Sequence, residues 1–475
     1  MMPLIGWIQL LSDRYLTDDV NTLPLARDLY EVMKQYPILS PHGHIDPKLI
    51  LENKAFANPV ELLVTPDHYI TRMLYSQGVS YESLGIPKKD GSGSGGAVDP
   101  KAVWQILADK WHLFRGTPSR IWVQEILYTL FGIDEVLTPA NAAALYDVID
   151  SKLKSPEFLP QALFNKFKIE VLATTDATAD DLSAHKAIAD LSLAGRVIPT
   201  FRPDDVSDPL RADFKSAMTK LGKAAGLEIN SFAALQQGLR NQRELFKSLG
   251  ATATDHGVFS AQTLVATDSE KEALFKQVMQ GADLATVEKY RAVMLMEHAL
   301  MSADDGLVMQ LHPGSLRNYD QKIFDTYGAD RGFDFPVSLT FTKELQPLLN
   351  EVGHNKNFKM VLYTLDEATY SRELAPIAGA YPSVRLGPPW WFLDSLNGLA
   401  RWRDAVTETA GYYNTVGFID DTRAFCSVPV RHDVARRFDA GYLAKEVMRN
   451  RINKSEALEL AKDVAYNLSK DFFNL

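Results

Sequence analysis

The chain is short of two features that mark whole classes of protein, cysteine and excess positive charge. Cys426 is the only cysteine among 475 residues, so no intrachain disulfide can form and a reducing compartment is the natural setting. Acidic residues outnumber basic ones by 60 to 50, which gives a net charge of -10. Because a nucleic-acid-binding protein presents a basic face to the phosphates, we expect no nucleic-acid partner.

Long apolar runs are also missing. Nowhere do about 18 apolar residues follow one another without a charge, so the sequence predicts no membrane span. Residues 1–11 are mildly apolar but lack a basic start and a small-residue cleavage site, and we expect no signal peptide there. These absences together predict a cytoplasmic protein that does not use a membrane as a partner.

A phosphate-binding loop is the third absence. Residues 88–96 are rich in Gly and Ser, but no Lys-Ser/Thr pair follows the glycines and no strand precedes them. The composition is typical of a mobile surface loop, to which the sequence assigns no function.

What is present is a set of apolar runs that alternate with helical segments. Hydrophobic residues make up 46% of the chain and charged residues 23%, as in a globular protein with a large core. We count eight runs as strands, of which the fourth is the weakest: 37–44, 169–176, 197–204, 251–257, 307–314, 360–366, 384–391 and 416–423. This alternation implies right-handed crossovers and a parallel sheet, and eight such units predict a (β/α)8 barrel. The alternative is an open doubly wound sheet, which usually places a Gly-rich phosphate turn after its first strand, and none is visible here.

Between the first and second runs the sequence is mostly helical. Trp104, Trp111 and Trp122 recur there with aliphatic residues at helix-like intervals, a pattern typical of core packing. We therefore expect an α/β fold, a distorted (β/α)8 TIM-type barrel that forms a single domain over residues 1–475. A large helical insertion, at about 47–167, is expected after its first strand.

The first run ends in His42 and His44. Strand side chains repeat every two residues, so two histidines at this spacing point the same way and converge at the end of the strand. A divalent cation can accept one nitrogen from each imidazole. The alternative is a pair of histidines in a Pro/Gly-rich turn.

The other runs also end in polar residues, where the active site of a barrel lies. Asp421 ends the last run, and with His42 and His44 it forms a ligand set that suits Zn²⁺ or a similar ion and leaves a position open. His312 is either a further ligand or a hydrogen-bonding partner of the substrate. Asp204 and Asp366 are expected to act as helix N-caps, since Asp is favoured at such turns.

Three arginines near the ends of the runs predict an acidic substrate. Arg202, Arg317 and Arg423 place positive charge there, and a guanidinium group binds a carboxylate through two hydrogen bonds. The alternative for each arginine is an ion pair on the surface, which contributes little to stability.

Ordered motifs along the chain, from about Leu16 to the C-terminus, resemble the uronate isomerases, a divergent branch of the amidohydrolase superfamily. The motifs are Pro41-His42-Gly43-His44, Asp67-His68-Tyr69, residues 115–120, 173–176 and 200–204, residues 253–257, Leu311-His312 with Gly314 and Arg317-Asn318, Trp390-Trp391-Phe392 and residues 421–425.

The resemblance implies interconversion of D-glucuronate with D-fructuronate and of D-galacturonate with D-tagaturonate through a cis-enediol. It implies a divalent metal, with Zn²⁺ the first candidate, on His42, His44 and Asp421, and a catalytic proton carrier at Asp421. Tyr69 and Arg423 are implied to assist proton movement at the substrate's oxygens. The residues implied to line the substrate pocket are His68, Arg202, His312, Arg317, Trp390 and Trp391. A hexuronate is the expected small-molecule partner. The sequence leaves open whether the protein forms a homo-oligomer.

The residues taken alone fit this chemistry. An aldose–ketose isomerase needs a base for the C2 proton, an acid/base for the oxygens and stabilisation of the enediol. Tyr69 has an ordinary pKa of about 10, so we expect Arg423 to favour its phenolate. The alternative functions are a metal-dependent hydrolase or decarboxylase on the same barrel, or a sugar-acid binding protein without activity. A hydrolase of this superfamily would usually add a lysine on the fourth strand, which the run at 251–257 lacks.

Overall fold

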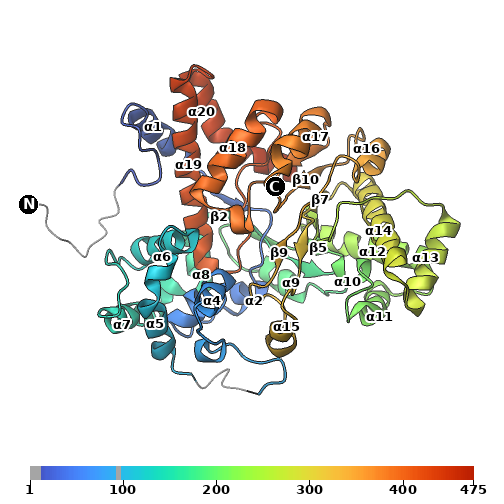
Figure 1. The fold of residues 1–475 in the computed structure, drawn as a ribbon, viewed down its shortest axis with the longest axis horizontal. Coiled ribbons are helices and arrows are strands. Elements are labelled where there is room, and N and C mark those ends of the chain that lie inside the picture. The colour runs from blue at the N-terminus through green and yellow to red at the C-terminus, as the bar shows by residue number, and fades with distance from the viewer. Residues whose placement is uncertain (1–11, 93–97) are drawn as a thin grey trace, which may run out of the picture.

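The computed structural model describes residues 12–92 and 98–475 as an α/β protein with parallel sheets (Figure 1). The expectation for residues 1–11 lies outside this part of the chain, as does most of the glycine-rich portion of the loop at 88–96.

Two parallel sheets form the centre of the molecule. Their strands are short and mostly buried, as expected for parallel strands covered by helices, and several of them contain polar residues near their carboxyl ends. One sheet has the order β1-β2-β4, with β1 (Ile38–Ser40), β2 (Ile169–Ala173) and β4 (Arg196–Ile198). The other has the order β11-β10-β7-β6-β5-β3, with β3 (Asp176–Ala177), β5 (Phe201–Arg202), β6 (Ala253–His256), β7 (Val308–Leu311), β10 (Met360–Leu362) and β11 (Val384–Leu386). A small antiparallel pair, β8 (Ser315–Leu316) with β9 (Phe335–Pro336), lies apart from them.

Backbone hydrogen bonds connect the two sheets where the second and third runs pass from one to the other. Thr174 N donates to Ile198 O over 2.9 Å, and Asp176 N donates to Thr200 O over 3.0 Å. Each of these runs therefore contributes a strand to both sheets, and the polar ends of the strands are brought to one side.

Within the described residues, seven of the eight predicted runs contain strands, including the weak fourth run, which forms β6 and pairs with β7 over four residues. The eighth differs, since residues 416–423 form no strand. The chain beside them makes one parallel bridge, between Thr415 and Leu386. Gly417 and Asp421 have φ angles of +74° and +42°, which break the extended conformation that a ladder needs.

The segment between β1 and β2 folds into helices, as the sequence predicts. Four of them begin with an Asn, Asp or Thr cap followed by proline, a combination favoured at helix starts. Their bounds are α2 (Pro47–Glu52), α3 (Pro59–Leu63), α4 (His68–Tyr75), α5 (Pro100–Asp109), α6 (Pro118–Thr129), α7 (Ala142–Leu153) and α8 (Pro160–Lys166).

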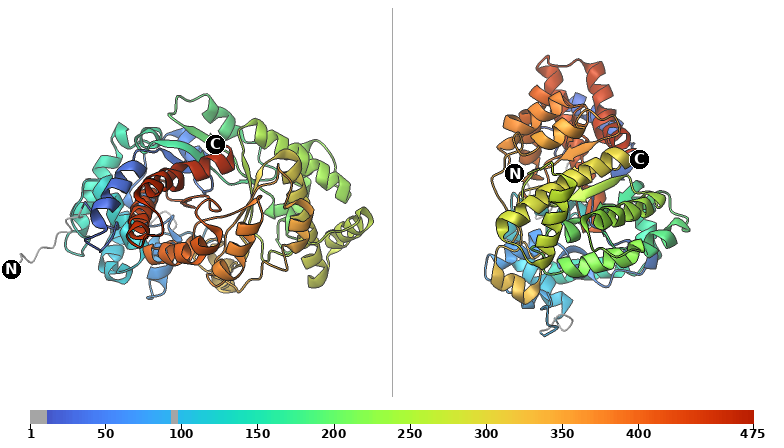
Figure 2. Two further views of the ribbon diagram at one scale, coloured as in Figure 1. Left: turned by 90° about the horizontal axis from the view of Figure 1, so that it is seen from above. Right: turned by 90° about the vertical axis from the view of Figure 1, so that its right-hand side faces the viewer.

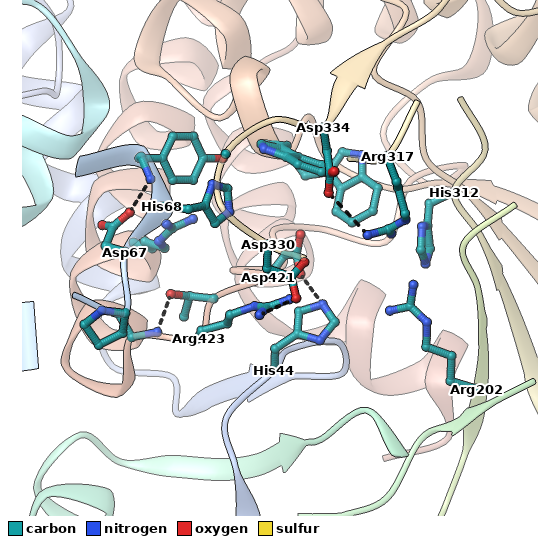
Figure 3. Close-up of a pocket in the computed structure, with 18 residues that line it drawn as sticks. His44, Asp67, His68, Arg202, His312, Arg317, Asp330, Asp334, Asp421 and Arg423 are labelled. Carbon is teal, nitrogen blue, oxygen red and sulfur yellow. Dashed lines mark hydrogen bonds and ion pairs between the residues drawn. The ribbon is translucent and has the colours of Figure 1, made fainter. Parts of the chain in front are cut away.

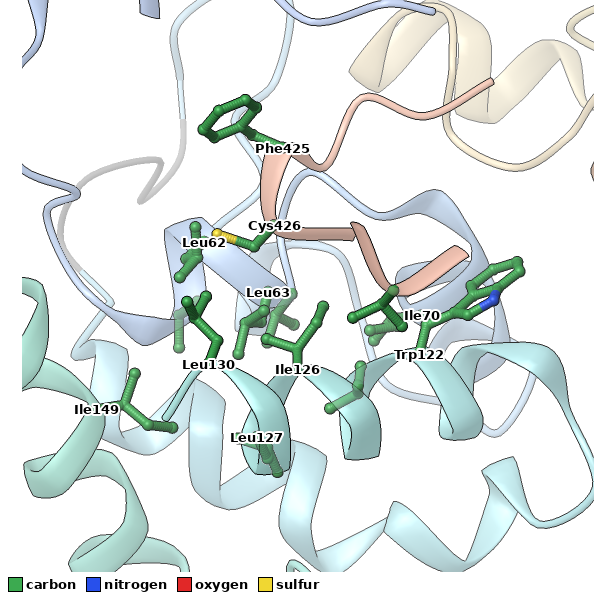
Figure 4. Close-up of a cluster of buried hydrophobic side chains, with 14 of the residues drawn as sticks. Leu62, Leu63, Ile70, Trp122, Ile126, Leu127, Leu130, Ile149, Phe425 and Cys426 are labelled. Carbon is green, nitrogen blue, oxygen red and sulfur yellow. The ribbon is translucent and has the colours of Figure 1, made fainter. Parts of the chain in front are cut away.

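These helices share an apolar core, which includes Trp104, Trp111 and Trp122, so the packing role predicted for the tryptophans is confirmed. Phe425 and Cys426, which follow the predicted ligand Asp421, are buried in the same core (Figure 4). The helical segment therefore holds in place the chain that carries Asp421.

Many of the remaining helices surround the strands, and others pack on this outer layer of helices (Figure 2). Helix α1 packs against α19 and α20, which brings the N-terminal part of the described chain to its C-terminal part. No helix in residues 12–92 and 98–475 is both long and apolar enough to cross a bilayer.

The bounds of the helices outside the segment between β1 and β2 are α1 (Leu23–Met33), α9 (Ser183–Ala189), α10 (Asp204–Ser207), α11 (Phe214–Ala225), α12 (Phe232–Ser248), α13 (Asp268–Gln280), α14 (Leu284–Asp305), α15 (Gln321–Tyr327), α16 (Gln346–Val352), α17 (Ala375–Ala380), α18 (Leu396–Ala410), α19 (Val428–Met448), α20 (Lys454–Lys462) and α21 (Leu468–Phe473). Shorter turns are η1 (Glu82–Leu84), η2 (Trp111–Phe114), η3 (Pro156–Phe158), η4 (Tyr370–Leu374), η5 (Trp391–Leu393), η6 (Phe425–Ser427) and η7 (Asp463–Asn467).

Candidate active site

A pocket opens where the carboxyl ends of the strands meet the start of α4 (Figure 3). It brings together ten of the eleven predicted site residues: His44, His68, Tyr69, Arg202, His312, Arg317, Trp390, Trp391, Asp421 and Arg423. The eleventh, His42, lies behind the pocket wall and is 1% exposed.

The three predicted metal ligands converge on one point. Asp421 Oδ1 lies 3.3 Å from Nε2 of His42 and 3.2 Å from Nε2 of His44, and the two imidazole rings are nearly perpendicular. Both histidines lie in the loop after β1 rather than on the strand. His44 is held there by its backbone N–H, which donates to Thr422 O over 3.1 Å.

The unpaired atoms of this cluster suit a cation. Both ring nitrogens of His42 and Oδ1 of Asp421 are buried without a hydrogen-bond partner among the described residues, although buried polar atoms are normally bonded. Burial alone would raise the pKa of Asp421, but the His42 and His44 imidazoles outweigh it and the pKa falls below its ordinary value. A carboxylate and two imidazoles with free nitrogens are donors that Zn²⁺ and similar ions accept.

Asp255, at the end of β6, forms a second buried cluster next to the first. Its carboxylate contacts His312 Nε2, lies 3.7 Å from His42 Nδ1 and pairs with Arg202 Nη1 at 3.2 Å. His42, Asp255 and His312 also lie close enough to hold a metal ion, whereas His312 is not part of the group formed by His42, His44 and Asp421. The sequence places Asp255 at the polar end of the fourth run and in one of the motifs that carry the resemblance, but it predicts no role for this residue in the site.

The predicted arginines line the pocket, and each is paired with a carboxylate. Arg423 Nη1 lies 3.0 Å from Asp330, and Arg317 Nη1 lies 3.5 Å from Asp334, both on the segment between β8 and β9. Arg202 Nε donates to Asp204 Oδ2 over 2.7 Å, and Gly257 N donates to the other oxygen of Asp204. The prediction that Asp204 caps a helix is therefore wrong, because Pro203 is the cap residue of α10 and the Asp204 carboxylate faces Arg202 instead.

Tyr69 projects from the first turn of α4, which is capped by the Asp67 side chain. Its hydroxyl donates to Asp394 Oδ2 over 3.3 Å. Burial raises the pKa of Tyr69 well above its ordinary value, Asp394 adds to this effect, and Arg431 opposes it. The expectation that Arg423 favours the phenolate is thus wrong, since Arg423 pairs with Asp330 and the cation next to Asp394 is Arg431.

Aromatic rings close the pocket. Trp390 is 7% exposed, and its ring lies edge-on to His312 and His42 at centroid distances of 4.8 and 5.8 Å. Trp391 lies edge-on to His68 at 5.8 Å. Burial lowers the pKa of His68 to about 4, so its imidazole is neutral at ordinary pH and can offer both a donor and an acceptor to a ligand.

The family model described as glucuronate isomerase matches residues 9–473. The uronate isomerase of Rhizobium meliloti (strain 1021) is 47% identical over 456 residues, which cover 96% of this chain and 97% of that protein. The crystal structure of glucuronate isomerase from Caulobacter crescentus superposes with a TM-score of 0.95 at 44% identity, covering 98% of this chain and 96% of that one. The crystal structure of uronate isomerase from Thermotoga maritima superposes with a TM-score of 0.91 at 29% identity, and the match covers 98% of this chain and 99% of that one.

Proposed function

The chain belongs to the glucuronate isomerase family and is an isomerase, and from this premise we propose that it interconverts aldose and ketose hexuronates. The proposed reactions convert D-glucuronate to D-fructuronate and D-galacturonate to D-tagaturonate by proton transfer through a cis-enediol. The observation that carries the proposal is the meeting of His42, His44 and Asp421 at one wall of a pocket that Arg202, Arg317 and Arg423 also line.

The pocket's charges support an acidic sugar as substrate. Arg317 is 39% exposed and is paired with the carboxylate of Asp334, so a substrate carboxylate can take the place of Asp334. Charge-assisted hydrogen bonds from guanidinium groups suit such an exchange. His68, His312, Trp390 and Trp391 enclose the rest of the sugar, and the indole rings exclude water from it.

We propose that His42, His44 and Asp421 hold a divalent cation, with Zn²⁺ the first candidate. When bound, it would supply positive charge that stabilises oxygen atoms of the substrate as negative charge develops on them. Asp421 is held beside the imidazoles in its ionised form, as a proton acceptor must be.

The proton steps are assigned to three residues. Asp421 takes the proton from C2 and returns it to C1, which moves the carbonyl along the chain of the sugar. Tyr69 and Arg423 handle the protons of the C1 and C2 oxygens, with the Tyr69 hydroxyl giving a proton to one and taking it from the other. The β6 residues Ala253, Thr254, Asp255 and His256 include no lysine, so nothing there favours the hydrolase alternative.

We propose that the two parallel sheets are arcs of one distorted (β/α)8 barrel, with the bridge at Thr415 as its eighth strand position and α2–α8 as the insertion after the first strand. The whole chain would then form one domain. A cytoplasmic location suits a chain whose only cysteine, Cys426, is a buried free thiol.

The proposed function is tested by incubating the purified, metal-supplemented protein with D-glucuronate and, separately, with D-galacturonate, and following ketose formation. We expect a ketose from at least one of them, and we expect Asp421→Asn to abolish it while the fold is retained. No ketose from either sugar with any divalent cation would overturn the proposal. Near-normal turnover by the Asp421→Asn variant would remove Asp421 from the mechanism.

A further inference from the structure

Behind the Tyr69 hydroxyl lies a buried acid–base pair that the predicted site does not include. Asp394 Oδ2 accepts hydrogen bonds from the Tyr69 hydroxyl over 3.3 Å and from Arg431 Nη1 over 3.1 Å. The side chains of Asp394 and Arg431 are each 6% exposed. Tyr69 and Arg431 both contribute to the lining of the pocket, whereas Asp394 does not. The Tyr69 hydroxyl thus stands between the pocket and an enclosed carboxyl group.

Arg431 is held firmly on α19. Its Nε donates to Ser427 Oγ over 3.0 Å, and its Nη1 also donates to the carbonyl oxygen of Asp420 over 3.0 Å. The guanidinium group stacks on Trp122, 3.6 Å from the ring centroid. A cation fixed in this way gives Asp394 a constant partner, so the carboxyl group keeps its place when its charge changes.

The carboxyl group of Asp394 is suited to hold a proton. Burial raises the pKa of Asp394 to about 7, although Arg431 opposes the rise. Its second oxygen, Oδ1, is buried without a hydrogen-bond partner among the residues that the structure describes. A tyrosinate next to an ionised Asp394 would place two negative charges together, so the pair always keeps at least one proton, and the carboxyl group of Asp394 can carry a second.

We propose that Asp394 is the proton partner of Tyr69 during the isomerisation, an inference that rests on the proposed function. When Asp394 is protonated on Oδ2, the hydrogen bond with Tyr69 is reversed and Oδ2–H donates to the phenolic oxygen. As Tyr69 gives its phenolic proton to the C1 carbonyl oxygen of the aldose, this carboxyl proton moves to the phenolic oxygen. When the C2 hydroxyl later gives up its proton to become the ketose carbonyl, that proton enters at Tyr69 and the phenolic proton returns to Asp394. Each group ends in its starting state, and Arg431 balances the carboxylate in between. Asp394 acts through Tyr69 and is a positioning residue.

Other charged groups also face the pair. Asp67, His68 and Arg72 come from α4 and its cap, Arg431 from α19, and Asp421 from the segment before η6. Because these remain when Asp394 alone is changed, a comparison of variants isolates its contribution.

The test is Asp394→Asn, which keeps the shape of the side chain and its ability to accept a hydrogen bond but removes the transferable proton. We expect kcat to fall about 100-fold, in the range of a lost proton-transfer partner, with little change in KM. Tyr69→Phe should lower kcat at least as far, and the double variant should lose no more than Tyr69→Phe alone. The matched control is Asp433→Asn, because Asp433 accepts from the Tyr30 hydroxyl and from Arg437 Nε between α1 and α19, away from the pocket. This control should keep wild-type turnover.

A second measurement needs no substrate. In protein labelled with ¹³C at tyrosine Cζ, the Tyr69 resonance is identified by its loss in Tyr69→Phe. We expect it to shift as pH passes through about 7 in the wild type and in Asp433→Asn, and to lose that shift in Asp394→Asn. Wild-type kcat in Asp394→Asn, additive losses in the double variant, or an unchanged titration without Asp394 would each overturn the proposal. If the wild type forms no ketose, but its Tyr69 resonance shifts with pH and loses that shift in Asp394→Asn, the pairing of Tyr69 with Asp394 is supported and the proposed function is wrong.

Discussion

The backbone N–H of His44 donates a hydrogen bond to the carbonyl oxygen of Thr422, over 3.1 Å. This bond joins the loop after the first strand to the segment that carries Asp421, and it sets Nε2 of His44 3.2 Å from Oδ1 of Asp421. The geometry of the proposed metal site therefore depends on contact between two segments at opposite ends of the chain. It does not require the two histidines to lie on a strand.

The buried Asp255 carboxylate should determine how tightly the site binds its cation. It faces Nδ1 of His42 at 3.7 Å and pairs with Arg202, so it orients the imidazole that offers Nε2 to the metal. Loss of such an orienting carboxylate typically weakens metal binding by about 10- to 100-fold, and we expect Asp255→Asn to do so. Competition with a chromogenic chelator measures the affinity.

The control for this experiment is Asp334→Asn, which removes a carboxylate from the same pocket but away from the ligand atoms. Its cation affinity should stay near that of the wild type. Equal affinities in the Asp255 variant and the wild type would show that Asp255 does not orient His42.

Arg317 should contribute to binding of the hexuronate more than to turnover. Replacing its guanidinium group in Arg317→Gln removes a charge-assisted hydrogen bond to the substrate carboxylate, so we expect KM to rise about tenfold or more with a smaller change in kcat. Initial rates over a range of D-glucuronate concentrations separate the change in KM from the change in kcat. Arg401→Gln, which breaks an exposed ion pair with Glu367 on the outside of the molecule, is the control and should leave KM unchanged. A KM unaffected by Arg317→Gln would remove Arg317 from substrate binding.

Much of this site could be predicted from the chain because short-range patterns determine it. The apolar runs form the parallel strands. The position of a polar residue at the end of a run was enough to predict four members of the site: His42, His44, Arg202 and His312. The last run is the exception, since Gly417 and Asp421 adopt positive φ angles that hydropathy does not reveal.

Contacts between distant parts of the chain were not predictable in this way. Asp204 has the sequence context of a helix cap, but its carboxylate pairs with Arg202. Asp394 follows a tryptophan pair and looks like a turn residue, yet its hydrogen-bond partner Tyr69 lies 325 positions away. No local pattern joins such residues, so only the folded chain shows that they meet.

The stability of the protein should fall as the pH rises from about 4 to about 7, because of Asp176. Burial raises the pKa of this carboxyl to about 7, although hydrogen bonds from the Thr174 hydroxyl and Thr200 N oppose the rise. The folded state therefore holds the proton more tightly than the unfolded chain. The stabilisation is complete below the unfolded pKa of about 4 and is lost as the pH passes through about 7.

Asp176→Asn, which keeps a neutral side chain of the same shape, removes this dependence. The free energy of unfolding of this variant, relative to that of the wild type, should increase between pH 5 and pH 8 by at most about 3 kcal/mol. Urea denaturation at the two pH values measures the difference. A difference that is the same at both would contradict the raised pKa.

The central claim is that His42, His44 and Asp421 share one divalent cation. A crystal structure of the zinc-loaded protein, with anomalous data collected on both sides of the zinc absorption edge, tests it most directly. We expect one strong peak about 2.0–2.2 Å from Nε2 of His42, Nε2 of His44 and an oxygen of Asp421. No peak there, or a peak held instead by His42, Asp255 and His312, would contradict it.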